Sequence, residues 1–204
     1  LSINLVIISC ASNTNKFHIE LNSEKSFTKT AKEDYDIKES GIIKCFPEGK
    51  KKKILKDNEE KEVEASCELS AVQFYKNTLI FGNDKTFLDQ EISPIFSVPY
   101  KDETPEINSI TYYKNPKFYS TKKFEDFSIT LDKKYIFATT SFDRDDKNFE
   151  YNSVLFWQPN RSNEADFLTV LEENKESRDI KKYIQRELNN SKYFKEEGLT
   201  IIPE

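Results

Sequence analysis

The sequence ELSAVQFYKNTLIFGND, from Glu68 to Asp84, carries the pattern that decides the predicted fold class. Residues 69–74 and 78–82 are rich in β-branched and aromatic side chains, and both runs have the length of short strands. The polar tripeptide at 75–77 separates them and is typical of a tight turn. The stretch therefore predicts two antiparallel strands joined as a hairpin.

This pattern recurs along the chain, each time after a glutamate. EDFSITLDKKYIFATT follows from Glu125 and EGLTIIPE from Glu197, so Glu68, Glu125 and Glu197 lie 57 and then 72 positions apart. Four short predicted strands follow each of the first two glutamates, which defines units of about 68–114 and 125–171, and a third unit begins at about 197. Repeated four-stranded antiparallel units of about 50 residues are typical of β-propeller blades. We therefore predict an all-β chain that forms part of a β-propeller, because closure takes at least four blades.

One amphipathic helix is predicted near 177–190, between the second unit and the third. Ile180, Ile184 and Leu188 recur at intervals of four residues, which places them on one face of a helix. Asn189-Asn190 follows directly and is expected to end the helix. The apolar face is expected to pack against the outer wall of the propeller.

The composition argues against a nucleic-acid-binding protein. Charged residues make up 33% of the chain, yet 31 Lys and Arg face 36 Asp and Glu, for a net charge of -5. The one basic run, at 50–53, is followed closely by acidic residues and is interpreted as a solvated linker. A nucleic-acid surface needs concentrated positive charge, which this pattern does not supply.

The first ten residues, LSINLVIISC, resemble the end of a bacterial lipoprotein signal peptide. An apolar run at 5–8 is followed by the small Ser9 and by Cys10, whose thiol would carry the lipid after cleavage. A signal peptide normally begins with a charged region, so the chain is expected to be truncated at its start. An ordinary buried strand is the alternative interpretation of this segment.

On the lipoprotein interpretation the chain divides into three parts. Residues 1–10 are the remnant of the signal peptide, 11–40 are a polar tether, and 41–204 are the propeller portion. The lipid would hold the protein at a membrane of the bacterial cell envelope, outside the cytoplasm, in the periplasm or at the surface.

The cysteines do not fit a zinc site, and two of them can form a disulfide. Cys10, Cys45, Cys67 and the single His18 are too scattered for a four-ligand zinc site. In an oxidising compartment Cys45 and Cys67 can pair, with Cys10 left for the lipid. Two separate buried thiols are the alternative, because the sequence does not give the distance between them.

Short motifs at the beginning of each unit resemble the phytase-like, esterase-like β-propeller family of exported bacterial proteins. They are Glu68-Leu69-Ser70, Glu125-Asp126-Phe127 and Glu197-Gly198-Leu199, together with Asn83-Asp84-Lys85 at the end of a strand. Blades of that family often begin with Glu-Gly or Glu-x-Ser, and here the second motif has neither the glycine nor the serine. The resemblance covers about 67–204. It implies a propeller that either binds a ligand or hydrolyses a phosphoester or ester.

The three unit-opening glutamates are the first candidate site. If Glu68, Glu125 and Glu197 begin innermost strands, their carboxylates ring one end of a central channel. Converging carboxylates can bind a cation, or raise one another's pKa and act as acid and base. The alternative is a structural clasp, in which each glutamate accepts a hydrogen bond from the backbone of a neighbouring blade.

Two further groups are candidates for binding. Asn83, Asp84 and Lys85 follow a strand and can bind a polar ligand or a phosphate at the channel mouth, although Asn and Asp are also ordinary turn residues. Asp143 and Asp145 place carboxylates at alternate positions, as calcium loops do, although a solvated loop is the alternative.

Three functions are consistent with these patterns. The first is a lipid-anchored extracytoplasmic propeller that binds a small-molecule or protein ligand at the channel mouth. The second is a phytase-like hydrolase that uses the glutamates with a divalent cation such as calcium. The third is a small β-sheet lipoprotein that is not a propeller.

Overall fold

The computed structural model describes residues 4–9, 43, 45, 51–56, 59–64, 67–84, 92–144, 148–172, 175–177, 179–190, 193 and 195–202. The strands are β1 (Asn4–Ser9), β2 (Lys51–Lys56), β3 (Glu59–Glu64), β4 (Leu69–Phe74), β5 (Thr78–Asn83), β6 (Ile95–Lys101), β7 (Thr104–Pro105), β8 (Thr111–Tyr112), β9 (Phe124–Ile129), β10 (Ile136–Thr140), β11 (Val154–Trp157), β12 (Asp166–Phe167), β13 (Val170–Glu172), β14 (Lys175–Ser177) and β15 (Glu196–Ile202). The helical segments are α1 (Pro116–Tyr119), the 3-10 turn η1 (Ser162–Glu164) and α2 (Ile180–Glu187). The described part is mostly β, with antiparallel sheets and one sheet curled into half a barrel, which confirms the all-β class.

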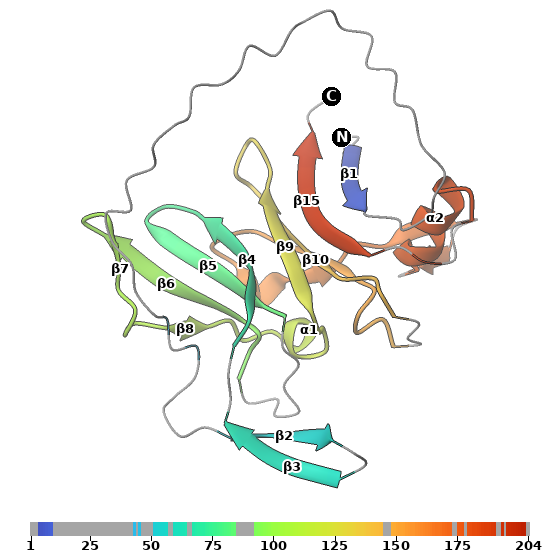
Figure 1. The fold of residues 1–204 in the computed structure, drawn as a ribbon. Coiled ribbons are helices and arrows are strands. Elements are labelled where there is room, and N and C mark those ends of the chain that lie inside the picture. Colours follow the sequence, from blue (N-terminus) through green and yellow to red (C-terminus); the bar gives the residue numbers. More distant parts are fainter. Residues whose placement is uncertain are drawn as a thin grey trace, which may run out of the picture.

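Two antiparallel meanders make up most of the structure (Figure 1). The first has the strand order β4-β5-β6, with β7 and β8 both paired to β6. The second has the order β9-β10-β11-β12 and is a separate sheet. The first meander lies within the predicted unit 68–114, and the second covers most of the predicted unit 125–171.

The two meanders pair their strands in the same register. In each, the pairing of the first strand with the second skips one residue, Ser70 in β4 and Glu125 in β9, which is a β-bulge. The next four residues of each first strand then pair consecutively. Equivalent positions on the four strands include Val72 and Phe127, Gly82 and Thr139, Ile95 and Val154, and Tyr112 and Phe167. A register shared through four strands and a bulge indicates two copies of one supersecondary unit.

β15 repeats the beginning of this unit a third time. It pairs antiparallel with β1, and the pairing skips Glu197 between Glu196 and Gly198. β1 thereby occupies the position of a second strand. Part of the segment interpreted as a signal remnant is thus a paired strand in this structure, whereas Cys10 and residues 11–40 lie outside the described residues.

Apolar side chains hold the successive units together. Phe127 of β9 is buried and packs in one cluster with Ala71 and Ile80 of the first meander and with Trp157. The equivalent residue of β15, Leu199, is buried in a second cluster with residues of the second meander and of α2. The second and third units therefore each bury the first strand against the unit before it.

The predicted turn of the first hairpin has two central residues. Lys76 and Asn77 have φ angles of 43° and 57°, and Tyr75 and Thr78 exchange both backbone hydrogen bonds, at 2.9 and 3.0 Å. Positive φ at both central positions suits the right-handed twist of a hairpin, and Asn tolerates it well. The residues at 75–78 therefore account for this two-residue turn without help from the rest of the chain.

The predicted helix forms, but it is shorter than 177–190. Asp179 caps it by accepting a hydrogen bond from Lys182 N at 3.1 Å, and the helix ends at Glu187, with Leu188 as the C-cap. Ser177 instead belongs to β14, which pairs with β13. Ile180 and Ile184 pack in the cluster that contains Leu199, so the helix covers the side of the second meander on which β15 lies.

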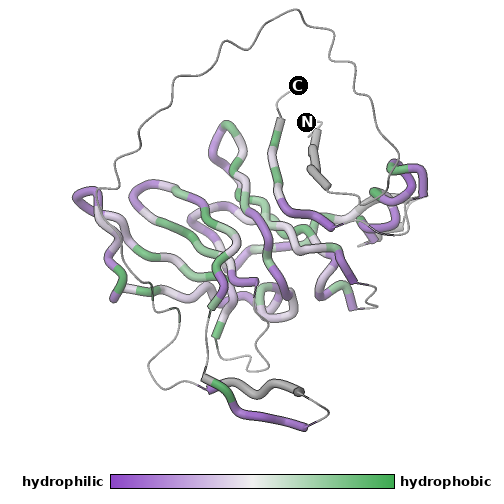
Figure 2. The backbone as a smooth tube through the Cα atoms, viewed as in Figure 1, coloured by the Kyte–Doolittle hydropathy of each residue, from purple (hydrophilic) through white to green (hydrophobic). Residues whose placement is uncertain are grey.

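The basic run interpreted as a linker is partly a strand. Residues 51–53 belong to β2, which pairs with β3 in a register that sets lysine positions opposite glutamate positions, and Lys51 Nζ lies 3.8 Å from Glu62 Oε2. Opposite charges at facing positions stabilise a hairpin. The hairpin stands apart from the meanders in Figure 1, and Figure 2 shows β3 as largely hydrophilic.

We expect the Gly82→Ala substitution to lower the free energy of unfolding by about 1–3 kcal/mol, because it overpacks the contact between the two meanders. A Cβ at Gly82 would lie 2.6 Å from Cζ of the buried Phe127 and 3.1 Å from Cβ of Ala71. Gly198→Ala is the matched control, because its nearest neighbour would be Asp126 Oδ2 at 3.8 Å. Urea unfolding measures both, and equal midpoints would contradict the packing described here.

Candidate functional site

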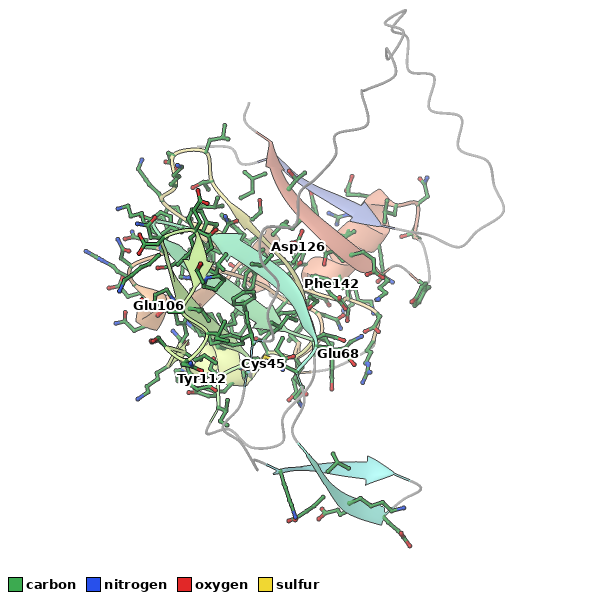
Figure 3. All side chains as sticks on the ribbon, turned by 60° about the vertical axis from the view of Figure 1, so that its left-hand side comes forward. Cys45, Glu68, Glu106, Tyr112, Asp126 and Phe142 are labelled. Carbon is green, nitrogen blue, oxygen red and sulfur yellow. A yellow bond between two sulfur atoms is a disulfide. The ribbon has the colours of Figure 1, made fainter. Side chains whose placement is uncertain are left out.

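Charged residues from four segments meet where the first strands of the units begin. Asp84 follows β5, Lys123 precedes β9, Asp143 follows β10 and Lys195 precedes β15. We call these residues, together with Glu125 and Glu197, the charged cluster. Figure 3 shows Asp126 and Phe142 beside β15, on the side of the molecule where these segments meet.

Lys123 lies among three carboxylates of the cluster. Its Nζ is 3.1 Å from Asp143 Oδ2, 3.8 Å from Glu125 Oε1 and 4.0 Å from Asp84 Oδ1. The Lys123 side chain is only 17% exposed, and Asp84 Oδ1 is buried without a hydrogen bond. The ammonium group of Lys123 therefore offsets the negative charge of carboxylates at the ends of three different strands.

Asp143 remains an ionised carboxylate. Burial alone would raise its pKa, but hydrogen bonds from Ser141 and Lys123 and the charges of Lys123 and Arg144 lower the pKa below its usual value. Ser141 Oγ donates to Asp143 Oδ1 at 2.7 Å, and Lys123 Nζ donates to Oδ2. Asp143 is thus the fixed negative charge of the cluster.

Glu125 behaves differently from Asp143. Burial, followed by the negative charge of Asp84, raises the pKa of Glu125 to about 7, against the opposing charges of Lys195 and Lys123. Its side chain is only 9% exposed, at the bulge of β9. A carboxyl group that titrates near neutral pH can act as an acid or a base, and such groups concentrate at functional sites.

The three predicted glutamates do not occupy equivalent positions. The skipped residues are Ser70, Glu125 and Glu197, so Glu68 corresponds to Lys123 and Lys195, two residues before each bulge. Glu125 and Glu197 act on each other electrostatically, whereas the side chain of Glu68 is exposed. The predicted ring of three glutamates is therefore wrong in its alignment, because a residue pattern does not reveal where a bulge shifts the register.

Asn83 and Asp84 have separate roles in the structure. Asn83 is buried, and its Oδ1 accepts a hydrogen bond from Glu68 N at 2.9 Å, while Asp84 N donates to Glu68 O at 2.8 Å. Asn83 therefore ties β5 to the residue before β4, and only the side chain of Asp84 joins the charged cluster. Lys85 lies outside the described residues.

A clasp between units exists, but other residues make it. Ser70 Oγ donates to the carbonyl O of Phe124, which links β4 to β9. Asp126 Oδ2 accepts a hydrogen bond from Leu199 N at 2.7 Å, which links β9 to β15. In the clasp alternative the acceptor was a glutamate, whereas here Asp126, the residue next to Glu125, accepts the backbone hydrogen bond.

The calcium loop suggested for Asp143 and Asp145 is only partly covered by the described residues. Asp143 is bonded to Ser141 and Lys123, and Asp145 lies outside the described residues. Among the residues described, no three His, Cys, Asp or Glu side chains are grouped so that they could hold a metal ion. Lys123 supplies the positive charge that a cation would otherwise bring to the cluster.

Cys45 and Cys67 form a disulfide, with their Cα atoms 6.0 Å apart. Tyr112 Oη donates to the carbonyl O of Cys45, and Cys45 is buried against Phe96 and other residues of the first meander. The disulfide therefore fixes the segment before β4 to the side of the first meander that faces away from the second.

Several residues of the site were not identified from the sequence. Lys123, Lys195 and Glu196 were not among the predicted site residues, and Asp126 was named only as part of the motif that begins at Glu125. Glu196 is fully buried, at 0% exposure. An acidic residue in the first position of a predicted strand, where the other units have Leu69 and Phe124, is the signal that could have revealed it.

No family model, characterised protein or solved structure matches the chain. No helix in the described ranges is long and apolar enough to cross a membrane. Fold and site together define the chain as an antiparallel β-repeat protein with a charged cluster at one end of its units.

We expect Lys123→Met to lower the free energy of unfolding by about 1–3 kcal/mol, because it leaves poorly solvated carboxylates without their counter-charge. Lys101→Met is the matched control, since Lys101 pairs with Glu106 at 3.0 Å but its side chain is 67% exposed. Exposed pairs contribute little, so this control should unfold like the wild type. Urea unfolding at pH 7 gives both values, and a Lys123 variant as stable as the control would contradict the central role of this ammonium.

Proposed function

We propose that the chain is part of an exported β-propeller protein that binds a ligand with cationic groups at the charged cluster. The observation that carries the proposal is the convergence of Asp84, Glu125 and Asp143 around Lys123, at the end where the first strands begin. Ligands of β-sheet repeat proteins commonly bind where loops from several repeats meet.

The repeat geometry supports a propeller. β4 and β15 both lie beside β9, so the first strands of three units form a row. Phe127 and Leu199 are buried against the preceding unit, whereas the equivalent Val72 is 54% exposed and its neighbour on the same face, Phe74, is 50% exposed. An exposed pair at this position is consistent with a further unit that would stack on the first meander, as propeller blades do.

Export is supported by the disulfide between Cys45 and Cys67, because such bonds persist in oxidising compartments. The apolar run before Ser9 and Cys10 supports attachment through a lipid on Cys10, at the periplasmic or outer side of a bacterial membrane. In the lipidated form residues 1–9 would be removed, and β15 would then be free to pair with another strand.

The charges favour a cationic ligand. Carboxylates from Asp84, Glu125, Asp143 and Glu197 contribute to the cluster, against the ammonium groups of Lys123 and Lys195. The guanidinium of Arg144, on a side chain that is 55% exposed, adds a third positive charge 3.8 Å from Asp143 Oδ1, which leaves a surplus of one carboxylate. Lys195 Nζ is only 2.5 Å from Glu197 Oε1, so this one carboxylate largely neutralises the positive charge of Lys195. A surplus of partly buried carboxylates attracts amines and guanidinium groups and repels anions. The metal-assisted hydrolase gains no support from the residues described, because none of their acidic groups forms a metal site.

Binding is tested with fluorescently labelled hexalysine at pH 8 and low salt, where Glu125 is ionised because its pKa is about 7. Glu125→Gln should weaken binding by roughly 3–10-fold, since it removes one charge of the cluster. Glu106→Gln is the matched control, because Glu106 pairs with Lys101 away from the cluster. Fluorescence anisotropy measures both. Equal affinities for the two variants, or equally tight binding of hexaserine, would contradict the proposal.

Lipid attachment is tested by metabolic labelling with an alkyne-tagged palmitate in bacteria that export the chain behind a complete lipoprotein leader ending at Cys10. We expect Cys10→Ala to abolish the label, because only this thiol follows the apolar run. Cys67→Ala should keep it and serves as the cysteine control. Labelling that survives in Cys10→Ala, or is absent from the wild type, would exclude a lipid on Cys10.

A further inference from the structure

Glu196 is a buried acid where the other units have an apolar residue. Glu196 is the residue directly before the bulge of β15. The equivalent residues are Leu69 in β4 and Phe124 in β9. Its side chain is 0% exposed, and neither carboxyl oxygen has a hydrogen-bond partner. An unpaired carboxylate is very costly to bury, so the neutral acid is the form that fits this place.

The surroundings of Glu196 favour a bound proton. Burial, then the negative charges of Asp126 and Glu125 on β9, raise the pKa of Glu196 to about 7. The Thr139 hydroxyl of β10 and the Gly198 amide lie close enough to oppose the rise, but neither makes a hydrogen bond of ordinary geometry to the carboxyl group.

The cations near β15 are engaged elsewhere. Lys195 on the same strand pairs with Glu197, at 2.5 Å. Lys181 of α2, the helix that packs with β15 around Leu199, donates to the carbonyl O of Arg144 at 2.7 Å. The charged groups that shift the pKa of Glu196 are Asp126 and Glu125, and both are acidic.

Glu196 sits beside the bonds that hold β15 in place. Its own amide donates to Ser141 O at 2.9 Å, and Leu199 N donates to Asp126 Oδ2 at 2.7 Å. A negative charge on Glu196 repels Asp126, whose carboxylate makes the second of these bonds. Ionisation therefore opposes the attachment of β15 to β9 and β10.

We propose that Glu196 is a proton-dependent latch, which holds β15 against β9 and β10 when protonated and weakens that attachment when it ionises. β15 carries Glu197 and is preceded by Lys195, so the latch also decides whether these two residues belong to the charged cluster. This link to ligand binding rests on the proposed function, whereas the latch itself does not.

The direction of the pH dependence follows from linkage. The closed form binds a proton more tightly than the open form, in which Glu196 has an ordinary pKa of about 4.3. The attachment is therefore strongest below that value, is lost progressively as the pH rises, and changes no further above a pH of about 7. The opening equilibrium should increase up to about tenfold per pH unit within this window.

Hydrogen exchange of the full chain, read by mass spectrometry between pH 5 and 8 with a chelator present and corrected for intrinsic exchange rates, tests the latch. Protection of peptides covering 195–202 should fall between about pH 5 and 7 and then level off, while peptides covering 136–140 keep theirs. Glu196→Gln should remove most of the fall, because the amide is neutral throughout and Glu125, whose pKa is also about 7, then acts on β15 only through Lys195 and Glu197. Glu197→Gln is the matched control on the neighbouring exposed residue and should retain it.

The proposal is overturned if wild-type 195–202 shows constant protection, or if Glu196→Gln shows the same fall as the wild type. It is also overturned if added calcium restores protection at pH 8, since a cation rather than a proton would then neutralise the site. The wild-type series decides the question alone if the variant does not fold. Failure of hexalysine to bind would refute the proposed function and leave this result unaffected.

Discussion

Strand β9 is contacted on two sides, and the arrangement of the units depends on it. Phe124 and Phe127 bury large aromatic surfaces in the core shared with the first meander, which accounts for most of the favourable free energy at this contact. Asp126, between them in sequence, accepts the hydrogen bond that attaches β15. One short strand thus combines apolar packing and the hydrogen bond from Ser70 on the side of the first meander with the hydrogen bond from Leu199 on the side of β15.

That arrangement also explains why the charges gather at one end. The units repeat in one register, so their first strands begin at the same level and their connections meet there. Residues at strand ends need not pack, which leaves Asp84, Lys123 and Asp143 available to face one another. Partial burial in this place weakens solvation, and the same burial that concentrates the charges moves the pKa values of Glu125 and Glu196 toward neutrality.

The sequence predicts the structure correctly where the signal is local. Alternating runs and a polar tripeptide predicted the first hairpin, and the spacing of Ile180 and Ile184 predicted the helix, although β14 shortens it. Glu125, Asp84, Asp143 and Glu197 were named and do meet. Their partner Lys123 was not, because a lysine next to another lysine before a strand carries no distinctive pattern.

The sequence by itself determined the antiparallel β class, the repeat and the four acidic members of the cluster, because these follow from residue type and period along the chain. Only the tertiary structure decided the alignment of the units, since a bulge at Ser70, Glu125 and Glu197 shifts the register without any mark in composition. It also decided the burial of Glu196. Burial depends on which strands pack around a residue, and that is a property of contacts between segments far apart in the chain.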